Sequence, residues 1–349
     1  MSDQRSGTFG RSREGSRTRP PILALDGGGS KIDAALIKAD GTVLGAARWS
    51  GSVYDGLQDG GSLNGIARAV KEACRDAGRD PDDLPAAELG VYCVAGADFP
   101  EDDAHIAGLI ASRGLTETDV VRNDTFAVLR AGTDRGWGIA VVCGSGINCV
   151  GVAPNGETVR FPALGLISGD LSDSYLMGAG ALGAAVRAGD GRGPRTALER
   201  LVPEYFSLQT PMQVVEAIHF GRLREDRLVE LTPVVFAAVR EGDEQARNLL
   251  SRQVDEAVAM AGAAIRRLHL RSQDVDVVLG GGMFRNDGPF VQSIGDGILA
   301  VAPRARIAVL DALPVLGAGL IGLDHVDAAE AAKARLRSAL THARLAGET

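Results

Sequence analysis

Two glycine-rich turns carry the clearest chemical signal in the sequence. The residues of the first are Gly27, Gly28, Gly29, Ser30 and Lys31, and those of the second are Gly144, Ser145 and Gly146. Backbone N–H groups hold a phosphate chain well, and glycine lets the main chain approach where any Cβ would collide. Two such turns facing each other therefore predict a clamp for one nucleotide. The alternative is a pair of ordinary hairpins whose glycines only supply positive φ.

Two features beside these turns extend the prediction. Asp26 ends the apolar run before the first turn, where a carboxylate could orient Mg²⁺ through its waters. A third turn, Gly280-Gly281-Gly282, follows the apolar residues 275–279, and its backbone could lie flat against an adenine ring and ribose. A plain strand-to-helix turn explains these three glycines equally well.

A phosphoryl transfer to an alcohol also needs a group that accepts the hydroxyl proton. Asn123-Asp124 follows the apolar pair Val120-Val121, so Asp124 would stand at the end of a strand and face a cleft. The local alternative makes Asp124 the N-cap of the next helix, a common duty of aspartate. The residues near 27, 145, 281 and 124 must meet around one triphosphate if the prediction is right.

The elements that would position these residues form one plan used twice. The first unit is predicted to have three strands separated by turns, at residues 22–25, 32–38 and 43–44. The second unit repeats this order with strands at residues 138–142 and 149–152. Amphipathic patterns predict covering helices at 63–77, 102–113, 174–187 and 255–268, with further strands at 275–279 and 306–310. The predicted fold is α/β with two related domains, 21–134 plus 316–345 and 135–315.

The composition favours small-molecule chemistry. The 349 residues are 45% hydrophobic and carry a formal net charge of -8, which argues against a nucleic-acid partner. The four cysteines lack C-x-x-C spacing and predict buried, reduced thiols. No apolar run has the length of a membrane span and the N-terminus lacks a signal peptide, so we expect a cytoplasmic protein that binds no membrane. Residues 1–20 predict a disordered tail.

Two segments match the dinucleotide pattern G-x-G-x-x-G but lack its context. They begin at Gly178 and Gly317. The first lies inside a helical pattern, and the second follows a strand but shows no acidic residue near the expected offset, so small residues for close helix packing explain both better. A Walker A loop is absent because Ile32 follows Lys31 where Ser or Thr is required.

The ordered motifs resemble the BadF/BadG/BcrA/BcrD-type ATPase family, which includes N-acetylglucosamine kinases. The resemblance covers roughly residues 22–325 and rests on both phosphate turns, on Asn123-Asp124, on residues 280–283 including Met283, on residues 314–318 and on the segment 94–102. It implies two duplicated ribonuclease H-like domains of the actin and hexokinase type with a nucleotide cleft between them.

The resemblance also implies ATP and Mg²⁺ as cofactors and Asp124 as the catalytic base rather than a mere cap. It implies that Asp26 and Asp170 organise the metal and that residues 280–283 contact adenosine. The acceptor sugar would then be held by Ser52, Gly96, Ala97, Asp98, Asn123, Asp124, Gly165 and Asp170. We expect a small-molecule sugar partner and keep a homodimer as one possible assembly.

Departures from the family pattern concern the acceptor. Leu164 and Leu171 stand where the family has Trp and Glu, and residues 50–55 lack the Asn of its sugar-holding pair. The prediction is a kinase for an N-acetylglucosamine- or glucosamine-like sugar, with a modified amino sugar or aminocyclitol as the alternative acceptor. A nucleotide-binding regulator without kinase activity is the alternative from another class.

Overall fold

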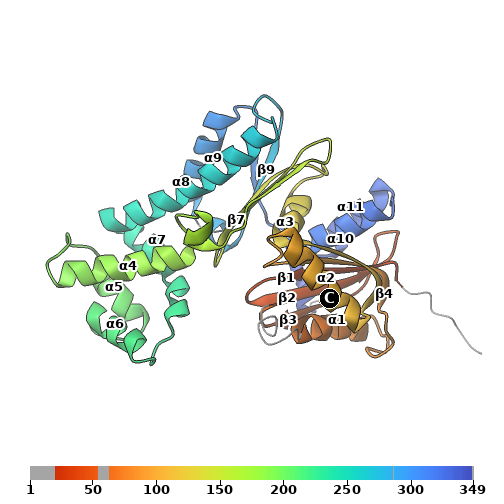
Figure 1. The fold of residues 1–349 in the computed structure, drawn as a ribbon, viewed down its shortest axis with the longest axis horizontal. Coiled ribbons are helices and arrows are strands. Elements are labelled where there is room, and N and C mark those ends of the chain that lie inside the picture. Colours follow the sequence, from red (N-terminus) through yellow and green to blue (C-terminus); the bar gives the residue numbers. More distant parts are fainter. Residues whose placement is uncertain (1–19, 54–62, 286, 348–349) are drawn as a thin grey trace, which may run out of the picture.

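Two mixed β-sheets organise the computed structural model, which describes residues 20–53, 63–285 and 287–347 (Figure 1). The first sheet has the strand order β3-β2-β1-β4-β5 and the second β8-β7-β6-β9-β10. In each sheet three consecutive strands form an antiparallel meander. Two further strands then run parallel to the central strand, which is β1 in the first sheet and β6 in the second. The same topology therefore occurs twice, as the repeated turns predict. Most of the predicted tail, residues 1–19, lies outside the described residues.

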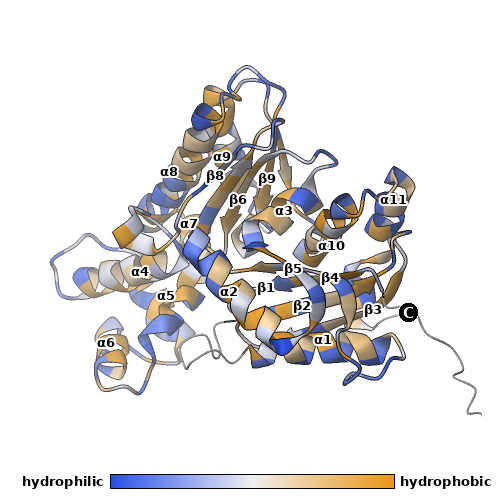
Figure 2. Cartoon of the chain, turned by 45° about the vertical axis from the view of Figure 1, so that its right-hand side comes forward, coloured by the Kyte–Doolittle hydropathy of each residue, from blue (hydrophilic) through white to orange (hydrophobic). Residues whose placement is uncertain are grey.

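The first lobe is the first sheet with the helices on its two faces. Its strands are Ile22–Gly27 (β1), Lys31–Ile37 (β2), Val43–Ser50 (β3), Ala87–Val94 (β4) and Thr116–Asn123 (β5), and its helices are Asn64–Asp76 (α1), Pro100–Arg113 (α2), Pro314–His325 (α10), Glu330–Ala339 (α11) and His342–Ala346 (α12). Alternate residues of β1 serve opposite faces, because Leu23 packs with α1 and α2 whereas Ile22 packs with α10. Figure 2 shows the resulting hydrophobic strands beneath two-coloured helices.

The second lobe is the second sheet with a larger set of helices. Its strands are Gly138–Cys143 (β6), Ile147–Val152 (β7), Thr158–Arg160 (β8), Asp276–Gly280 (β9) and Arg306–Val309 (β10), and its helices are Ser174–Gly189 (α4), Leu198–Tyr205 (α5), Pro211–His219 (α6), Thr232–Arg240 (α7), Glu244–Arg267 (α8) and Gly288–Val301 (α9). Buried residues of β6, β7 and β9 form one core with α8 and α9. The other face of the sheet packs against Asp124–Gly132 (α3).

Helix α3 lies between the two sheets, beside α10 (Figure 1). Ala127 belongs to the core of the first lobe, whereas Phe126, Val128 and Leu129 belong to a core with β6, β7 and β9. A Cβ added at Gly317 of α10 would stand 1.9 Å from the carbonyl oxygen of Ala127, so only glycine lets the two helices approach this closely. The prediction that this glycine serves helix packing rather than dinucleotide binding is confirmed.

The structure differs from the sequence-based element boundaries mainly in the second lobe. The helix expected at 255–268 starts at Glu244, because the side chain of Asp243 accepts a hydrogen bond from Ala246 N at 2.8 Å and caps it there. Gly178 packs against Leu228, whose carbonyl oxygen would lie 1.9 Å from an added Cβ, so this glycine also serves helix packing. Within the described residues, no helix combines the length and the apolar character that a membrane crossing requires.

Candidate active site

The first glycine-rich turn joins β1 to β2 as a closed hairpin. Gly28 N donates to the carbonyl oxygen of Lys31 at 3.0 Å, and Gly29 and Ser30 are exposed at the tip. The ammonium of Lys31 lies 3.1 Å from a carboxylate oxygen of the fully buried Asp33. The positive charge predicted to serve phosphates therefore contacts Asp33 in this structure.

The second turn joins β6 to β7 in the equivalent place of the other sheet. Gly144 N donates to the carbonyl oxygen of Gly146 at 2.9 Å, and Ser145 and Gly146 are exposed. A Cβ added at Gly144 or Gly146 would meet nothing within 4 Å, so protein packing does not require glycine at either position. The space above this turn suits a ligand that approaches the backbone.

The third turn is packed directly against the second. Gly281 has a φ of +106°, and a Cβ there would lie 2.2 Å from the carbonyl oxygen of Cys143, at the end of β6. The hydroxyl of Ser174, the first residue of α4, donates to the carbonyl oxygen of Gly144 and lies 3.8 Å from the sulfur of Met283. Gly281 therefore brings Met283 beside the second turn, as the nucleotide prediction requires.

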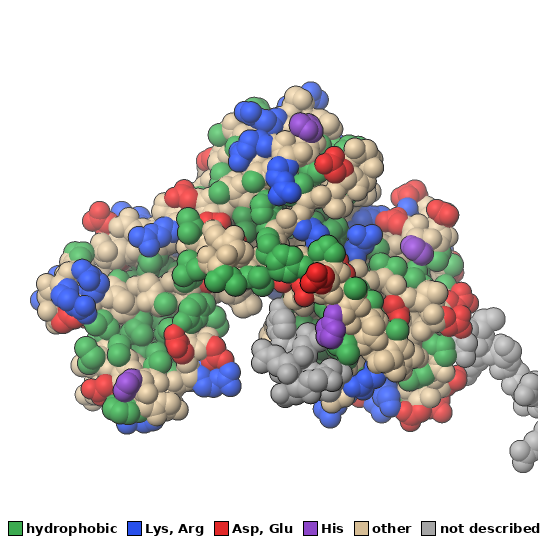
Figure 3. All heavy atoms as spheres, in the orientation of Figure 1, with side chains coloured by type: hydrophobic (Ala, Val, Ile, Leu, Met, Phe, Trp, Pro, Cys, Tyr) green, Lys and Arg blue, Asp and Glu red, His purple; other side chains and the backbone are tan. Residues whose placement is uncertain are grey.

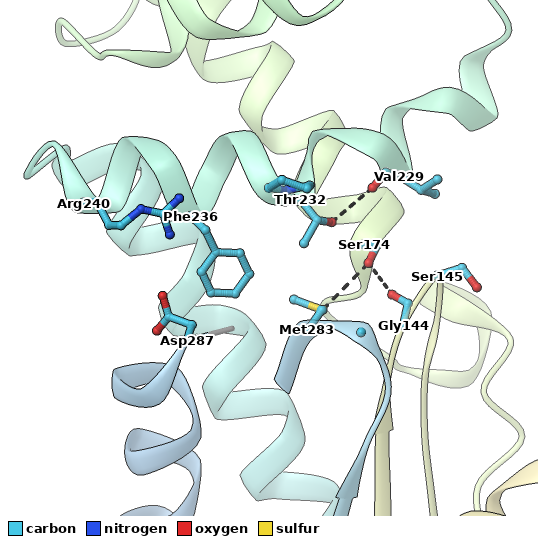
Figure 4. Close-up of a pocket in the computed structure, with 11 residues that line it drawn as sticks. Gly144, Ser145, Ser174, Val229, Thr232, Phe236, Arg240, Met283 and Asp287 are labelled. Atoms are coloured by element: carbon cyan, nitrogen blue, oxygen red, sulfur yellow. Dashed lines mark hydrogen bonds between the residues drawn. The ribbon is translucent and has the colours of Figure 1, made fainter. Parts of the chain in front are cut away.

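A cavity of about 570 Å³ opens between these turns and the helices of the second lobe (Figure 4). Gly144, Ser145 and Ser174 stand at one end of it, and Phe236, Arg240 and Asp287 at the other. Most of its wall is apolar, contributed by Val229, Pro233, Phe236 and Met283. An apolar slot with a few polar groups at its ends fits a purine base and ribose, so we term it the nucleoside cavity.

A second cavity, of about 150 Å³, lies where the two lobes meet. Its lining includes the predicted residues Gly96, Asp98, Asn123, Asp124, Gly144, Ser145 and Gly146, together with Ala95, Ile147, Asn148 and Ala163. We term it the acceptor cavity. Gly144 and Ser145 line both cavities, so the two spaces meet at the second turn.

Asn123, not Asp124, caps helix α3. The Asn123 side-chain oxygen accepts from Thr125 N at 3.0 Å and from the Thr125 hydroxyl at 2.5 Å. Its amide group donates to Asp98 Oδ1 at 2.9 Å. The expectation that Asp124 might be the cap is therefore wrong, because the capping oxygen comes from the residue before it. Asp124 itself lines the acceptor cavity.

Burial raises the pKa values of the two carboxyl groups that line this cavity. Burial raises the pKa of Asp124 to about 6, although N–H groups at the start of α3 oppose the shift. Burial and the charge of Asp124 raise the pKa of Asp98 to about 7. A base with a pKa near 6 is ionised at neutral pH and still accepts a proton readily.

Asp26, the carboxylate predicted to serve a magnesium ion, lies near the end of β1, beside the first turn. It is 7% exposed, and burial followed by the charge of Asp124 raises its pKa to about 8, which a nearby cation would reverse. Among the described residues, no group of three or more His, Cys, Asp or Glu side chains could hold a metal. Mg²⁺ fits such a site, because it keeps several waters and takes one or two carboxylates plus phosphate oxygens.

Eleven predicted residues line neither of the two cavities, and they are Asp26, the five residues of the first turn (Gly27–Lys31), Gly281, Ser52, Ala97, Gly165 and Asp170. One carboxylate oxygen of Asp170 accepts from Gly165 N at 2.9 Å and from the Ser168 hydroxyl at 2.7 Å, so this side chain closes its own loop. Gly165 has a φ of +71° in that loop. Ser52 follows β3, and Ala97 is fully buried behind the residues that line the acceptor cavity.

The structure also adds residues that the sequence did not single out. Asn148 lines the acceptor cavity, and its amide lies 3.5 Å from Asn123 Oδ1. Phe236, Arg240 and Asp287 line the nucleoside cavity from α7 and the start of α9. Asn148 could have been found from its place two residues after the second turn, whereas no local pattern marks the other three.

The chain resembles curated sugar kinases along most of its length. It is 25% identical over 311 residues to an N-acetylmuramic acid/N-acetylglucosamine kinase of Clostridium acetobutylicum, covering 88% of this chain and 99% of that protein. It is 24% identical over 318 residues to an N-acetyl-D-glucosamine kinase of Dictyostelium discoideum, covering 87% of this chain and 98% of the relative.

Solved structures share the fold. A Chromobacterium violaceum protein provisionally named an N-acetylglucosamine kinase matches with a TM-score of 0.68 and 22% identity, over 86% of this chain and 98% of its own. A ROK family glucokinase from Streptomyces griseus, solved with glucose and AMPPNP, matches with a TM-score of 0.52 and 16% identity, over 87% and 98%. The predicted fold class is confirmed. The model of the BadF/BadG/BcrA/BcrD ATPase family matches residues 23–322, and the chain belongs to this family.

Proposed function

We propose that the chain is an ATP- and Mg²⁺-dependent kinase that phosphorylates a hydroxyl of an amino sugar of the N-acetylglucosamine or glucosamine type. The observation that carries the proposal is the meeting of the nucleoside and acceptor cavities at Gly144 and Ser145, with Asp124 in the wall of the second. The names of the curated relatives support the same substrate class.

In the proposed reaction, Asp124 orients the acceptor hydroxyl and takes its proton. The hydroxyl oxygen then bonds to the γ-phosphorus while the bond from that phosphorus to the β,γ-bridging oxygen breaks, and ADP leaves. The backbone N–H groups of the second turn hold the phosphates in line with the hydroxyl. When bound, Mg²⁺ neutralises phosphate charge, and Asp26 would hold it through water ligands. A metal role for Asp170 stays a prediction.

The acceptor side supports a second candidate, a kinase for a modified amino sugar or aminocyclitol. Leu164, Leu166, Ile167 and Leu171 are 46%, 65%, 88% and 69% exposed, and they follow Ala163, which lines the acceptor cavity. Figure 3 shows hydrophobic side chains gathered on the surface close to the junction of the two lobes. An apolar rim suits an acceptor that carries an apolar substituent.

The test is an ADP-release assay with ATP, Mg²⁺ and a panel of acceptors. The panel contains glucosamine, N-acetylglucosamine, N-acetylmuramic acid, longer N-acyl glucosamines and aminocyclitols. Turnover of the first two supports the first candidate, and preference for the others supports the second. Tight ATP binding without acceptor-stimulated ADP release would refute both kinase candidates in favour of a nucleotide-binding regulator.

The domain bounds, the location and the assembly of the chain are also proposals. The proposed domains are 21–134 plus 316–345 and 135–315. Limited proteolysis, with cleavage expected where the chain passes from one domain to the other, tests these bounds. The location is the cytoplasm, which the four buried free thiols support. The homodimer is tested by light scattering on the purified protein.

A further inference from the structure

Arg160 joins the two lobes beside the acceptor cavity. It is the last residue of β8 in the second lobe, and its guanidinium contacts the carboxylate of Asp103 on α2 in the first lobe. The two distances are 2.6 Å from Nη1 to Oδ2 and 3.2 Å from Nη2 to Oδ1. Such a two-bond contact between partly buried groups is geometrically specific, unlike most exposed ion pairs.

The same guanidinium also contacts the acceptor loop, which we define as Gly96, Ala97 and Asp98. Nη2 of Arg160 donates to the carbonyl oxygen of Ala97. Ala97 is fully buried, and its neighbours Gly96 and Asp98 both line the acceptor cavity. Arg160 therefore fixes the centre of a loop whose two ends face the acceptor.

Bonds from the first lobe secure the rest of the acceptor loop. Asp98 N and Phe99 N donate to Asp102 Oδ2 at 3.2 and 2.8 Å, and Asn123 donates to Asp98 Oδ1. These contacts hold the loop to its own lobe. The contact from Arg160 comes from the other lobe, and Ala163 of the cavity wall follows it by three residues. One side chain of the second lobe thus holds the acceptor loop of the first lobe, and both lobes contribute to the cavity wall.

We infer that Arg160 is a positioning residue that couples acceptor binding to the junction of the two lobes by holding the acceptor loop against the second lobe. The inference rests on the proposed kinase function. Arg160 lines neither the nucleoside cavity nor the acceptor cavity, so it acts through the acceptor loop. Its effect falls on acceptor binding and leaves the nucleoside cavity unchanged.

The positive charge of Arg160 also helps to hold the acceptor loop in place. The positive charge of Arg160 lowers the pKa of Asp98, whereas burial and the charges of Asp124, Asp102 and Asp103 raise it. Loss of the cation therefore shifts Asp98 toward its protonated form at neutral pH. A protonated Asp98 accepts the Asn123 amide less strongly, which loosens the loop further.

The experiment compares Arg160→Gln, Arg160→Lys and Asp103→Asn with a matched control, Arg135→Gln. Arg135 also contacts a backbone carbonyl and a carboxylate, both of Asp274, but lies away from both cavities. With N-acetylglucosamine as the probe, we expect Arg160→Gln to raise the acceptor KM about tenfold or more and to change the ATP KM less than about twofold. The part of the acid limb of kcat/KM for the acceptor that follows the protonation of Asp98 should move to higher pH.

A substrate-free measurement separates this inference from the proposed function. Hydrogen exchange of the amides of residues 95–99 should accelerate in Arg160→Gln and Asp103→Asn, less in Arg160→Lys and not in Arg135→Gln. Unchanged exchange in these amides overturns the inference whatever the substrate is. Faster exchange with no turnover of N-acetylglucosamine by the native protein supports the positioning role and refutes the proposed acceptor.

Discussion

The side-chain amide of Asn123 donates to Asp98 Oδ1 at 2.9 Å and so joins the start of α3 to the acceptor loop. The oxygen of the same Asn123 side chain caps α3. One residue therefore fixes both the helix that begins with Asp124 and the carboxylate of Asp98, and both of these residues line the acceptor cavity.

Replacement of Asn123 separates these two duties. Asn123→Ala should lower the free energy of unfolding by about 1 kcal/mol through loss of the cap. It should also lower kcat/KM for the acceptor, because Asp98 loses its amide donor. Asn123→Ser retains a capping oxygen, so stability should recover while kcat/KM stays low. Thermal melts and steady-state kinetics measure both, and full kinetic recovery in the serine variant would contradict the proposed link to Asp98.

Asp124→Asn should lower kcat by about 10²–10⁴-fold, because the amide cannot take the hydroxyl proton. Titration calorimetry should find nucleotide affinity close to that of the native protein, since Asp124 does not line the nucleoside cavity. Retained turnover would remove Asp124 from the role of base.

The pH profile of the native protein should show an acid limb set by Asp124. Burial raises the pKa of this carboxyl to about 6, so turnover falls as the pH drops through about 6 and the base becomes protonated. Initial rates between pH 5 and 8 at saturating ATP measure the limb, and a limb near the ordinary aspartate value would contradict the assignment.

Asp26→Asn should stabilise the metal-free protein at alkaline pH while it lowers activity. Burial raises the pKa of Asp26 from 3.8 to about 8, so the native state keeps a proton that the unfolded chain loses above about pH 4. The free energy of unfolding therefore falls between about pH 4 and pH 8. The variant lacks this contribution and should be more stable at pH 8 by more than about 1 kcal/mol. Urea unfolding without Mg²⁺ tests this, and an identical pH dependence in both proteins would contradict it.

The third turn offers a matched pair of glycines. Gly281→Ala should destabilise the fold by roughly 1–3 kcal/mol, because its φ is +106° and its Cβ would meet the carbonyl oxygen of Cys143 at 2.2 Å. Gly282→Ala has open space within 4 Å and should leave stability nearly unchanged, while it weakens ATP binding if the nucleoside lies against this turn. Equal melting temperatures for the two variants would contradict the packing argument.

The sequence predicted the parts of the site that depend on local backbone geometry. Glycines after short apolar runs are typical of hairpins, so the sequence predicts both glycine-rich turns and their strands. The role of Asn123 was harder to predict, because Asn and Asp are both good caps and stand next to each other. The geometry of the helix start decided between them.

Contacts between distant segments could not be predicted in the same way. Arg160 is one of many arginines in the sequence, and nothing local shows that it meets Asp103, 57 positions away. The same holds for Arg240 and Asp287, which reach one cavity from separate helices. Such residues are selected by three-dimensional proximity rather than by spacing.

Helix α3 belongs to the hydrophobic cores of both lobes and begins with Asp124. A rotation of one lobe relative to the other would displace atoms in proportion to their distance from the rotation axis. A helix that packs against both lobes would lie near that axis. Asp124, as the first residue of this helix, would therefore lie close to the axis of such a rotation. A relative rotation of the two lobes would therefore displace Asp124 less than it displaces the outer walls of the cleft.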